Sequence, residues 1–66
     1  MNVTINGAAH EVPDGTTVAQ AVLTLTAATT GVAVAVNDEV VTRSAWETTA
    51  LGDRDRVEVL TAVQGG

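Results

Sequence analysis

The chain has no cysteine, lysine, phenylalanine or tyrosine among its 66 residues. Without cysteine it can form neither a disulfide nor a thiolate nucleophile, and without lysine it cannot form a Schiff base. No apolar run approaches the roughly 20 residues that a membrane-spanning helix needs, and the first residues lack the basic and apolar regions of a signal peptide. We therefore expect a cytoplasmic protein with no membrane partner.

Basic side chains are also scarce, because three arginines stand against eight carboxylates and the formal net charge is −5. Nucleic-acid binding needs a basic surface, so no nucleic-acid partner is expected. His10 is the single histidine, Ser44 fits a helix cap better than a nucleophile, and most acidic residues lie in predicted turns rather than in a metal-ligand cluster. The sequence thus predicts a protein that is not an enzyme and that holds no cofactor stably.

The apolar residues that are present, mostly valine and alanine, first follow the alternation of a strand. Residues 1–6 alternate between apolar and polar side chains, which is the period of a half-buried strand. Asn6-Gly7 is the strongest sequence signal for a two-residue hairpin turn. A second strand should therefore follow over residues 8–12, and Pro13-Asp14-Gly15 should end it.

A helix is predicted to begin after Thr17, because Thr17 and Gln20 have the spacing of a capping box. The helix should present one apolar stripe to the sheet, made of Val18, Ala21, Val22 and Leu25. The β-branched and small residues 26–30 should weaken it, with Gly31 as its end. If Leu25 is fully buried, Leu25→Ala should lower the free energy of unfolding by about 2–5 kcal/mol.

Further strand patterns occupy the second half of the chain. Residues 32–36 alternate valine with alanine and predict a strand that is apolar on both faces, and residues 40–41 predict a very short one. Residues 44–47 repeat the capping-box spacing and predict one helical turn, on which Trp46 would pack as a lid over one end of the core. Residues 56–63 predict the last strand.

The order of these elements, with strands on either side of a helix, predicts an α+β domain in which a mixed sheet packs on that helix. The domain should comprise residues 1–63. Residues 64–66 should form a flexible tail, because they follow the last strand pattern and have no local reason to be ordered. A domain of this size buries only about 60% of the surface that its unfolded chain exposes, so its stability should be modest.

The tail ends in Gly65-Gly66, a pair that would occur by chance in about one chain in two hundred. Glycine lets a partner's backbone approach closely, and three extended residues starting at Gln64 reach roughly 10 Å. The Gly66 carboxylate is ionised at neutral pH and must be activated before a nucleophile attacks it. Because the chain has no G-x-x-x-x-G-K-[ST] phosphate-binding loop, the activation must come from a partner, and we expect this chain to be a substrate or carrier and not a catalyst.

The last strand is apolar on both sides, since its odd-numbered valines face one way and its even-numbered apolar residues face the other. A two-layer domain covers only one face of its sheet. One of the two sets should therefore be exposed, and an exposed apolar surface next to the tail is typical of a partner site. The candidate partner-contact residues are Val57, Val59, Leu60 and Ala62, with Arg54 and Arg56 adding charge contacts.

Several segments together carry a family resemblance over essentially the whole chain. They are Asn6-Gly7, Gly15-Thr16-Thr17-Val18, Val22-Leu23, Val34-Ala35-Val36-Asn37, Val40-Val41, Arg43, Trp46, Asp55, Val57-Glu58-Val59-Leu60 and Ala62-Val63-Gln64-Gly65-Gly66. In their order and spacing they resemble the ThiS-type sulfur carriers of thiamine biosynthesis. The resemblance implies a ubiquitin-like β-grasp fold. One departure is the last strand, where members of that family often carry aromatic residues.

The resemblance also implies a function. A partner enzyme related to ubiquitin activators would use ATP and Mg to adenylate the Gly66 carboxylate. A sulfur donor system would then give a thiocarboxylate, and thiazole synthase would take its sulfur for thiazole formation. The absence of cysteine agrees with this, because the sulfur cannot be carried on a side-chain thiol.

Other readings of the same tail stay open. A related carrier for molybdopterin or cysteine synthesis shares the fold and the tail, although a molybdopterin-type subunit is usually longer. A ubiquitin-like modifier conjugated to proteins is a second alternative, but the absence of lysine argues against chain building, since no side-chain amine accepts a second copy. The third is a binding module in which the two glycines are incidental.

Overall fold

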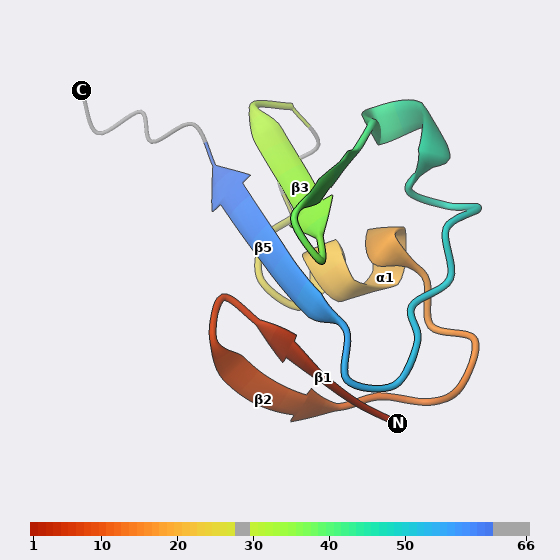
Figure 1. The fold of residues 1–66 in the computed structure, drawn as a ribbon. Coiled ribbons are helices and arrows are strands. Elements are labelled where there is room, and N and C mark those ends of the chain that lie inside the picture. The colour runs from red at the N-terminus through yellow and green to blue at the C-terminus, as the bar shows by residue number, and fades with distance from the viewer. Residues whose placement is uncertain (28–29, 62–66) are drawn as a thin grey trace.

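The computed structural model describes residues 1–27 and 30–61. Within these residues the elements are β1 (Asn2–Ile5), β2 (Ala8–Glu11), α1 (Val18–Leu23), β3 (Val32–Val36), β4 (Glu39–Val41), the 3-10 turn η1 (Arg43–Ala45) and β5 (Arg56–Thr61). The described strands make one mixed sheet in the order β2-β1-β5-β3-β4, and α1 packs on one of its faces (Figure 1). The predicted α+β fold, with a mixed sheet packed on a helix, is confirmed.

The last strand in the sequence is the central strand of the sheet. β5 pairs with β1 in parallel, with Thr4 opposite Arg56. On its other side it pairs with β3 in antiparallel orientation from Val57 to Thr61. The predicted extension of this strand to residue 63 lies outside the described residues. Because neighbours hold β5 on both sides, the strand that leads to the C-terminus is anchored in the middle of the fold.

Two hairpin turns share one backbone conformation and begin with the same residue type. Asn6 and Gly7 have φ angles of 52° and 83°, and Asn37 and Asp38 have φ angles of 51° and 72°. Positive φ at both central positions defines the type I′ turn that suits two-residue hairpins. The predicted Asn6-Gly7 turn is confirmed, and Asn37 occupies the equivalent position between β3 and β4.

The start of α1 is the predicted capping box. The Thr17 hydroxyl accepts the Gln20 backbone N–H at 3.3 Å, and the Gln20 side-chain oxygen accepts the Thr17 N–H at 2.9 Å. These bonds satisfy backbone donors that the first turn of a helix leaves without partners. The predicted burial of Val18, Ala21 and Val22 is confirmed.

The end of α1 differs from the prediction, because the helix stops at Leu23 and Leu25 is 46% exposed. The Leu25 N–H donates to the Val22 carbonyl at 2.9 Å, and the Thr24 N–H donates to the Ala21 carbonyl at 3.2 Å. Bonds to the third preceding residue wind the chain more tightly than an α-helix does. The side chain at position 25 therefore turns away from the buried face, and Leu25 is not part of the predicted stripe.

The short turn before Trp46 also differs in detail. It is a 3-10 turn that begins after Thr42, and the Thr42 side chain makes no capping hydrogen bond. The predicted capping box over residues 44–47 is wrong, because Ser44 lies inside the turn and not at its N-cap. The turn also ends earlier than predicted, at Ala45, and the Trp46 N–H caps it by donating to the Arg43 carbonyl at 3.3 Å.

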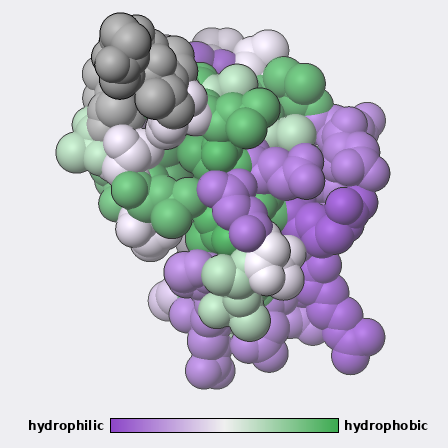
Figure 2. All heavy atoms as spheres, turned by 90° about the vertical axis from the view of Figure 1, so that its left-hand side faces the viewer, coloured by the Kyte–Doolittle hydropathy of each residue, from purple (hydrophilic) through white to green (hydrophobic). Residues whose placement is uncertain are grey.

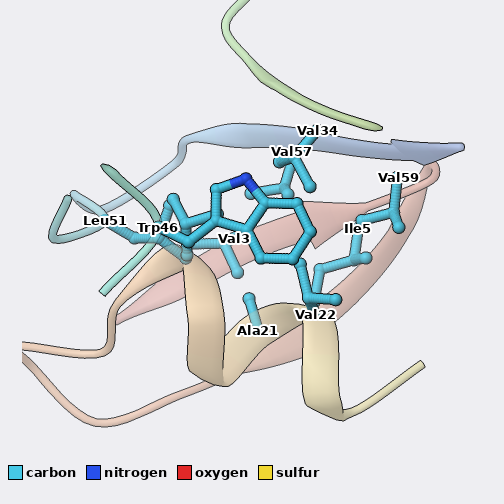
Figure 3. Packing of buried hydrophobic residues seen from close by; sticks show 10 residues of the cluster. Val3, Ile5, Ala21, Val22, Val34, Trp46, Leu51, Val57 and Val59 are labelled. Carbon is cyan, nitrogen blue, oxygen red and sulfur yellow. The ribbon is translucent and has the colours of Figure 1, made fainter. Parts of the chain in front are cut away.

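The core lies between α1 and the sheet and consists mostly of small side chains. Trp46 is the exception, since it is only 4% exposed and its indole lies between the helix and the strands (Figure 3). The indole Nε1–H donates to the Val41 carbonyl of β4 at 3.0 Å. Trp46 therefore lies inside the core, and not as a lid over one end of it. The buried cluster comprises Val3, Ile5, Val18, Ala21, Val22, Val34, Trp46, Leu51, Val57 and Val59.

Candidate functional site

The candidate site is the end of β5, from which the chain continues to its C-terminus. β5 ends at Thr61, which lies opposite Val32 at the start of β3. Residues 62–66 lie outside the described residues. They include the predicted site residues Ala62, Gln64, Gly65 and Gly66. The geometry on which the site depends is therefore that of the β5 end and of the surfaces around it.

The Asn6 side chain fastens β5 shortly before this end. Its Oδ1 accepts the Val59 N–H at 2.8 Å, and its Nδ2 donates to the Val59 carbonyl at 3.2 Å. The Asn6 backbone N–H donates to the Val57 carbonyl at 2.9 Å. The side-chain amide thus continues the parallel ladder between β1 and β5 by one step, after the backbone has turned into the hairpin.

Asn37 binds the start of β5 in a similar way. Its backbone N–H donates to the Arg56 carbonyl at 2.8 Å, and its Oδ1 accepts the Arg56 N–H at 3.1 Å. Its Nδ2 donates to Asp55 Oδ1 at 2.9 Å, while Asp55 Oδ2 accepts the Gly52 N–H at 2.7 Å. An asparagine from a hairpin turn therefore holds the central strand at each of its ends.

The structure decides which side of β5 is available to a partner. Val57 and Val59 face α1 and belong to the buried core, so their assignment as partner-contact residues is wrong. Leu60 faces the other way and is 71% exposed. A role of Leu60 in partner contact stays a prediction.

The exposed apolar surface around Leu60 continues across the sheet. Ala33 of β3 lies opposite Leu60, and Ala35 lies opposite Val40 of β4, which is exposed. Cross-strand partners share a face of the sheet, so we name Leu60, Ala33, Ala35 and Val40 the outer apolar face. Glu58 lies opposite Ala35 and adds a carboxylate to this face.

An open hollow of about 460 Å³ lies at the same end of the sheet. Its lining residues are Gly31, Val32, Ala33, Leu60 and Thr61. Figure 2, which views the molecule from the left of Figure 1, shows apolar side chains gathered on the upper part and hydrophilic side chains below. The apolar side chains of Val32, Ala33 and Leu60 therefore line the hollow beside the end of β5.

Arg54 and Arg56 lie at the opposite end of β5, so the prediction that they adjoin the tail is wrong. Arg56 begins the strand and Thr61 ends it, which separates them by roughly 17 Å at about 3.3 Å per residue. Arg56 Nη2 contacts Asp38 Oδ2 at 2.9 Å, and this hydrogen bond raises the pKa of Arg56 above its ordinary value. Arg54 is exposed, with its Nε 3.9 Å from Asp53 Oδ2.

Neither a metal-ligand cluster nor a membrane-spanning helix is present in the described part of the chain. No group of three or more His, Cys, Asp or Glu residues among residues 1–27 and 30–61 is placed to hold a metal ion. In the same ranges, no helix is long and apolar enough to cross a membrane. The feature that the geometry does provide is an anchored strand end beside an exposed apolar face.

Sequence reasoning missed the contacts of both turn asparagines with β5. From the sequence, Asn6 indicated only a hairpin turn. Its side-chain partner Val59 lies 53 positions away, and no local pattern connects the two residues. The sequence does show an asparagine at a turn position that glycine would also fit. This observation does not indicate which residue the asparagine side chain contacts. Leu23, which the predicted apolar stripe leaves out, is 66% exposed.

Comparisons with known proteins agree with this geometry. The model of the ThiS family matches residues 3–66. A crystal structure of the thiamine biosynthesis protein ThiS from Geobacter metallireducens is 34% identical, with a TM-score of 0.78 and 100% of each chain covered. A solution NMR structure of a thiamine biosynthesis protein from the same organism is 33% identical, with a TM-score of 0.81, and covers 100% of this chain and 88% of that one. No curated protein matches. The resemblance stated from the sequence and the ubiquitin-like β-grasp fold are confirmed.

Proposed function

The chain belongs to the ThiS family, and we propose that it is a sulfur carrier of thiamine biosynthesis that works through the carboxylate of Gly66. The observation that carries the proposal is the family match over residues 3–66, which includes Gly65-Gly66. The similarity to the solved ThiS structure over the full length of both chains supports it. In this role the chain is a substrate of partner enzymes and not a catalyst.

The chemistry follows from the state of the Gly66 carboxylate. A C-terminal carboxyl has a reference pKa near 3.3–3.7, so it is ionised at neutral pH and resists nucleophilic attack. A ubiquitin-activator-like enzyme, using ATP and Mg, joins a carboxylate oxygen to the α-phosphorus of ATP and releases pyrophosphate. A sulfide-level sulfur nucleophile from a donor system then attacks the acyl carbon of this acyl-adenylate, a C–S bond forms, and the C–O bond to AMP breaks. The product is a thiocarboxylate from which thiazole synthase takes sulfur for the thiazole ring.

The outer apolar face is the proposed docking surface for both enzymes. Exposed apolar surface on a small protein commonly marks a partner site, and Leu60 is the member of this face nearest the C-terminus. Gly66 lies six positions after Leu60 in the sequence, and six extended residues span at most about 22 Å. If one face serves both enzymes, they exclude each other, and the carrier must be released between activation and sulfur delivery.

Deletion of Gly66 tests the proposed function. Every member of the described core cluster lies between Val3 and Val59, so the shortened chain should keep its melting temperature. It should fail to support ATP–pyrophosphate exchange by the adenylating enzyme, because the reacting carboxylate has moved back by one residue. A shortened chain that is still adenylated and still transfers sulfur would refute the role of Gly66.

Intact mass measured on the chain isolated from cells separates the alternatives. Replacement of a C-terminal oxygen by sulfur supports a carrier, attachment to other proteins supports a modifier, and neither change supports a binding module. A carrier for molybdopterin or cysteine synthesis would gain the same sulfur, but it would not support thiazole formation by thiazole synthase.

A further inference from the structure

We propose that Asn6 is a positioning residue for the carrier reaction, because its side-chain amide fixes the point on β5 from which the C-terminal segment starts. The proposal rests on the proposed function, since the group that is presented is the Gly66 carboxylate. It assigns a part in that function to a residue in the first hairpin, at the far end of the sequence from the reacting group.

The Asn6 side chain takes over where main-chain pairing between β1 and β5 stops. Asn6 and Gly7 have positive φ and turn the backbone into β2, so no β1 residue remains to pair with Val59. The Asn6 amide fills that place, with Oδ1 accepting at 2.8 Å and Nδ2 donating at 3.2 Å. Both bonds need an acceptor and a donor on one short side chain, which the amide of asparagine supplies.

These bonds give the end of β5 a second neighbour. On the β3 side, pairing continues to Thr61, which lies opposite Val32. On the β1 side, Asn6 is the contact with Val59, and the Val59 side chain is buried in the core. A strand end that is paired on one side only opens more readily than one that is held on both. Loss of the Asn6 bonds should therefore loosen β5 from Val59 onward.

Loosening at Val59 would change how the reacting carboxylate is presented. Residues 59–61 would then be held by β3 alone, so the point from which the chain continues to Gly66 would be less fixed, and so would Leu60 on the outer apolar face. A less fixed origin lowers the effective concentration of a tethered group at a docked partner's active site. Correct placement of the reacting group is itself a large part of catalysis. Asn6 therefore keeps the point from which the C-terminal segment starts fixed on the sheet.

Asn37 provides a matched control at the opposite end of β5. It has the same residue type and nearly the same φ, 51° against 52° for Asn6. Its side chain also makes a pair of hydrogen bonds, to the Arg56 N–H and to the Asp55 carboxylate. Glycine tolerates positive φ, so Asn6→Gly and Asn37→Gly both keep the turn and remove the side-chain bonds, and both add the same backbone entropy of glycine. The variants should lose similar stability but loosen different ends of β5.

The experiment measures two properties of the full-length wild type and of both variants. Amide hydrogen exchange by NMR should become about tenfold faster or more at Val59 in Asn6→Gly, and at Arg56 in Asn37→Gly, because each amide loses its acceptor. ATP–pyrophosphate exchange by the adenylating enzyme should show kcat/KM lowered by about three- to tenfold in Asn6→Gly, and within about twofold of wild type in Asn37→Gly. A merely stabilising role of the asparagines would move both variants together.

Specific outcomes would overturn the proposal. Unchanged exchange at Val59 in Asn6→Gly would show that the amide does not hold the strand end. An equal loss of kcat/KM in both variants would show that stability, and not position, is what matters. If the wild type itself supports no ATP–pyrophosphate exchange, the proposed function fails. The exchange rate at Val59 still decides whether Asn6 fixes the origin of the C-terminal segment.

Discussion

Replacing Trp46 by alanine would remove the largest side chain of the core. The indole is 4% exposed and has small neighbours in the buried cluster, such as Ala21 and Val22 (Figure 3). Such neighbours cannot refill the space, and substitutions of this kind cost about 3–5 kcal/mol. At about 0.05–0.15 kcal/mol per residue, a chain of this length has a free energy of unfolding of about 3–10 kcal/mol. We therefore expect Trp46→Ala to remove a third or more of that free energy.

Comparing Trp46→Phe with Trp46→Ala separates two contributions to stability. The phenylalanine variant loses the indole hydrogen bond and part of the ring area, and the alanine variant loses the whole ring. Phenylalanine keeps an apolar ring but cannot donate to the Val41 carbonyl, which the Nε1–H contacts at 3.0 Å. Loss of a hydrogen bond costs about 0.5–1.5 kcal/mol. A buried apolar area smaller by roughly 40 Å² adds about 1 kcal/mol at about 25 cal/mol per Å². Trp46→Phe should therefore cost about 2 kcal/mol, clearly less than the alanine variant.

The assay is urea unfolding followed by far-UV circular dichroism for all three proteins. Wild type can also be followed by fluorescence, because Trp46 is the single aromatic residue of the chain. Equal m-values would show that the substitutions change stability and not the surface exposed on unfolding. A free energy for Trp46→Ala within about 1 kcal/mol of wild type would contradict the value expected for a buried indole, and with it the account of the core.

The helix end, the helix cap and the outer apolar face can each be tested by substitution. Val22→Ala should cost about 1–3 kcal/mol and Leu25→Ala less than about 1 kcal/mol, because only Val22 is buried; equal losses in thermal melts would show that α1 continues to Leu25. Thr17→Ala should cost about 1 kcal/mol through loss of the N-cap, and Thr17→Ser should restore most of it; a serine variant as unstable as the alanine variant would rule out the capping bond. Leu60→Asp should weaken binding to the adenylating enzyme about tenfold or more, since it places a charge in the outer apolar face. Leu23→Asp, at an exposed leucine of α1 on the helix-covered side of the sheet, should not weaken it, and equal weakening by both would exclude this face.

The chemistry proposed for the candidate site comes from the sequence, and its surroundings come from the structure. The proposed role of the Gly66 carboxylate depends on the order of residues 64–66, which can be read from the sequence, and it stays a prediction. The partner surface depends on which way the alternating residues of the last strand face. Alternation shows that Val59 and Leu60 face opposite ways, but their orientation depends on where α1 packs. The position of Arg56, about one strand length from the tail, depends in addition on the direction of β5.

What the sequence by itself determined is the set of features whose partners lie within a few residues. The Asn6-Gly7 turn and the capping box of Thr17 and Gln20 are of this kind. Each is specified by backbone φ preferences or by hydrogen bonds between near neighbours, so no distant residue has to be known. The predictions that failed locally, at Leu25 and in residues 44–47, concern the bounds of short helical turns. One residue more or less there changes which face a side chain occupies.

Only the tertiary structure decided the contacts between segments that are far apart in the sequence. It placed β5 at the centre of the sheet, parallel to β1, and brought Val59 to the Asn6 side chain across 53 positions. It also showed that Trp46 is a member of the buried core, where the sequence had predicted a lid over one end of it. These outcomes depend on how several apolar faces pack together at once, and burial of apolar area has no direction of its own. A sequence pattern can therefore state that a residue is buried without stating which residues bury it.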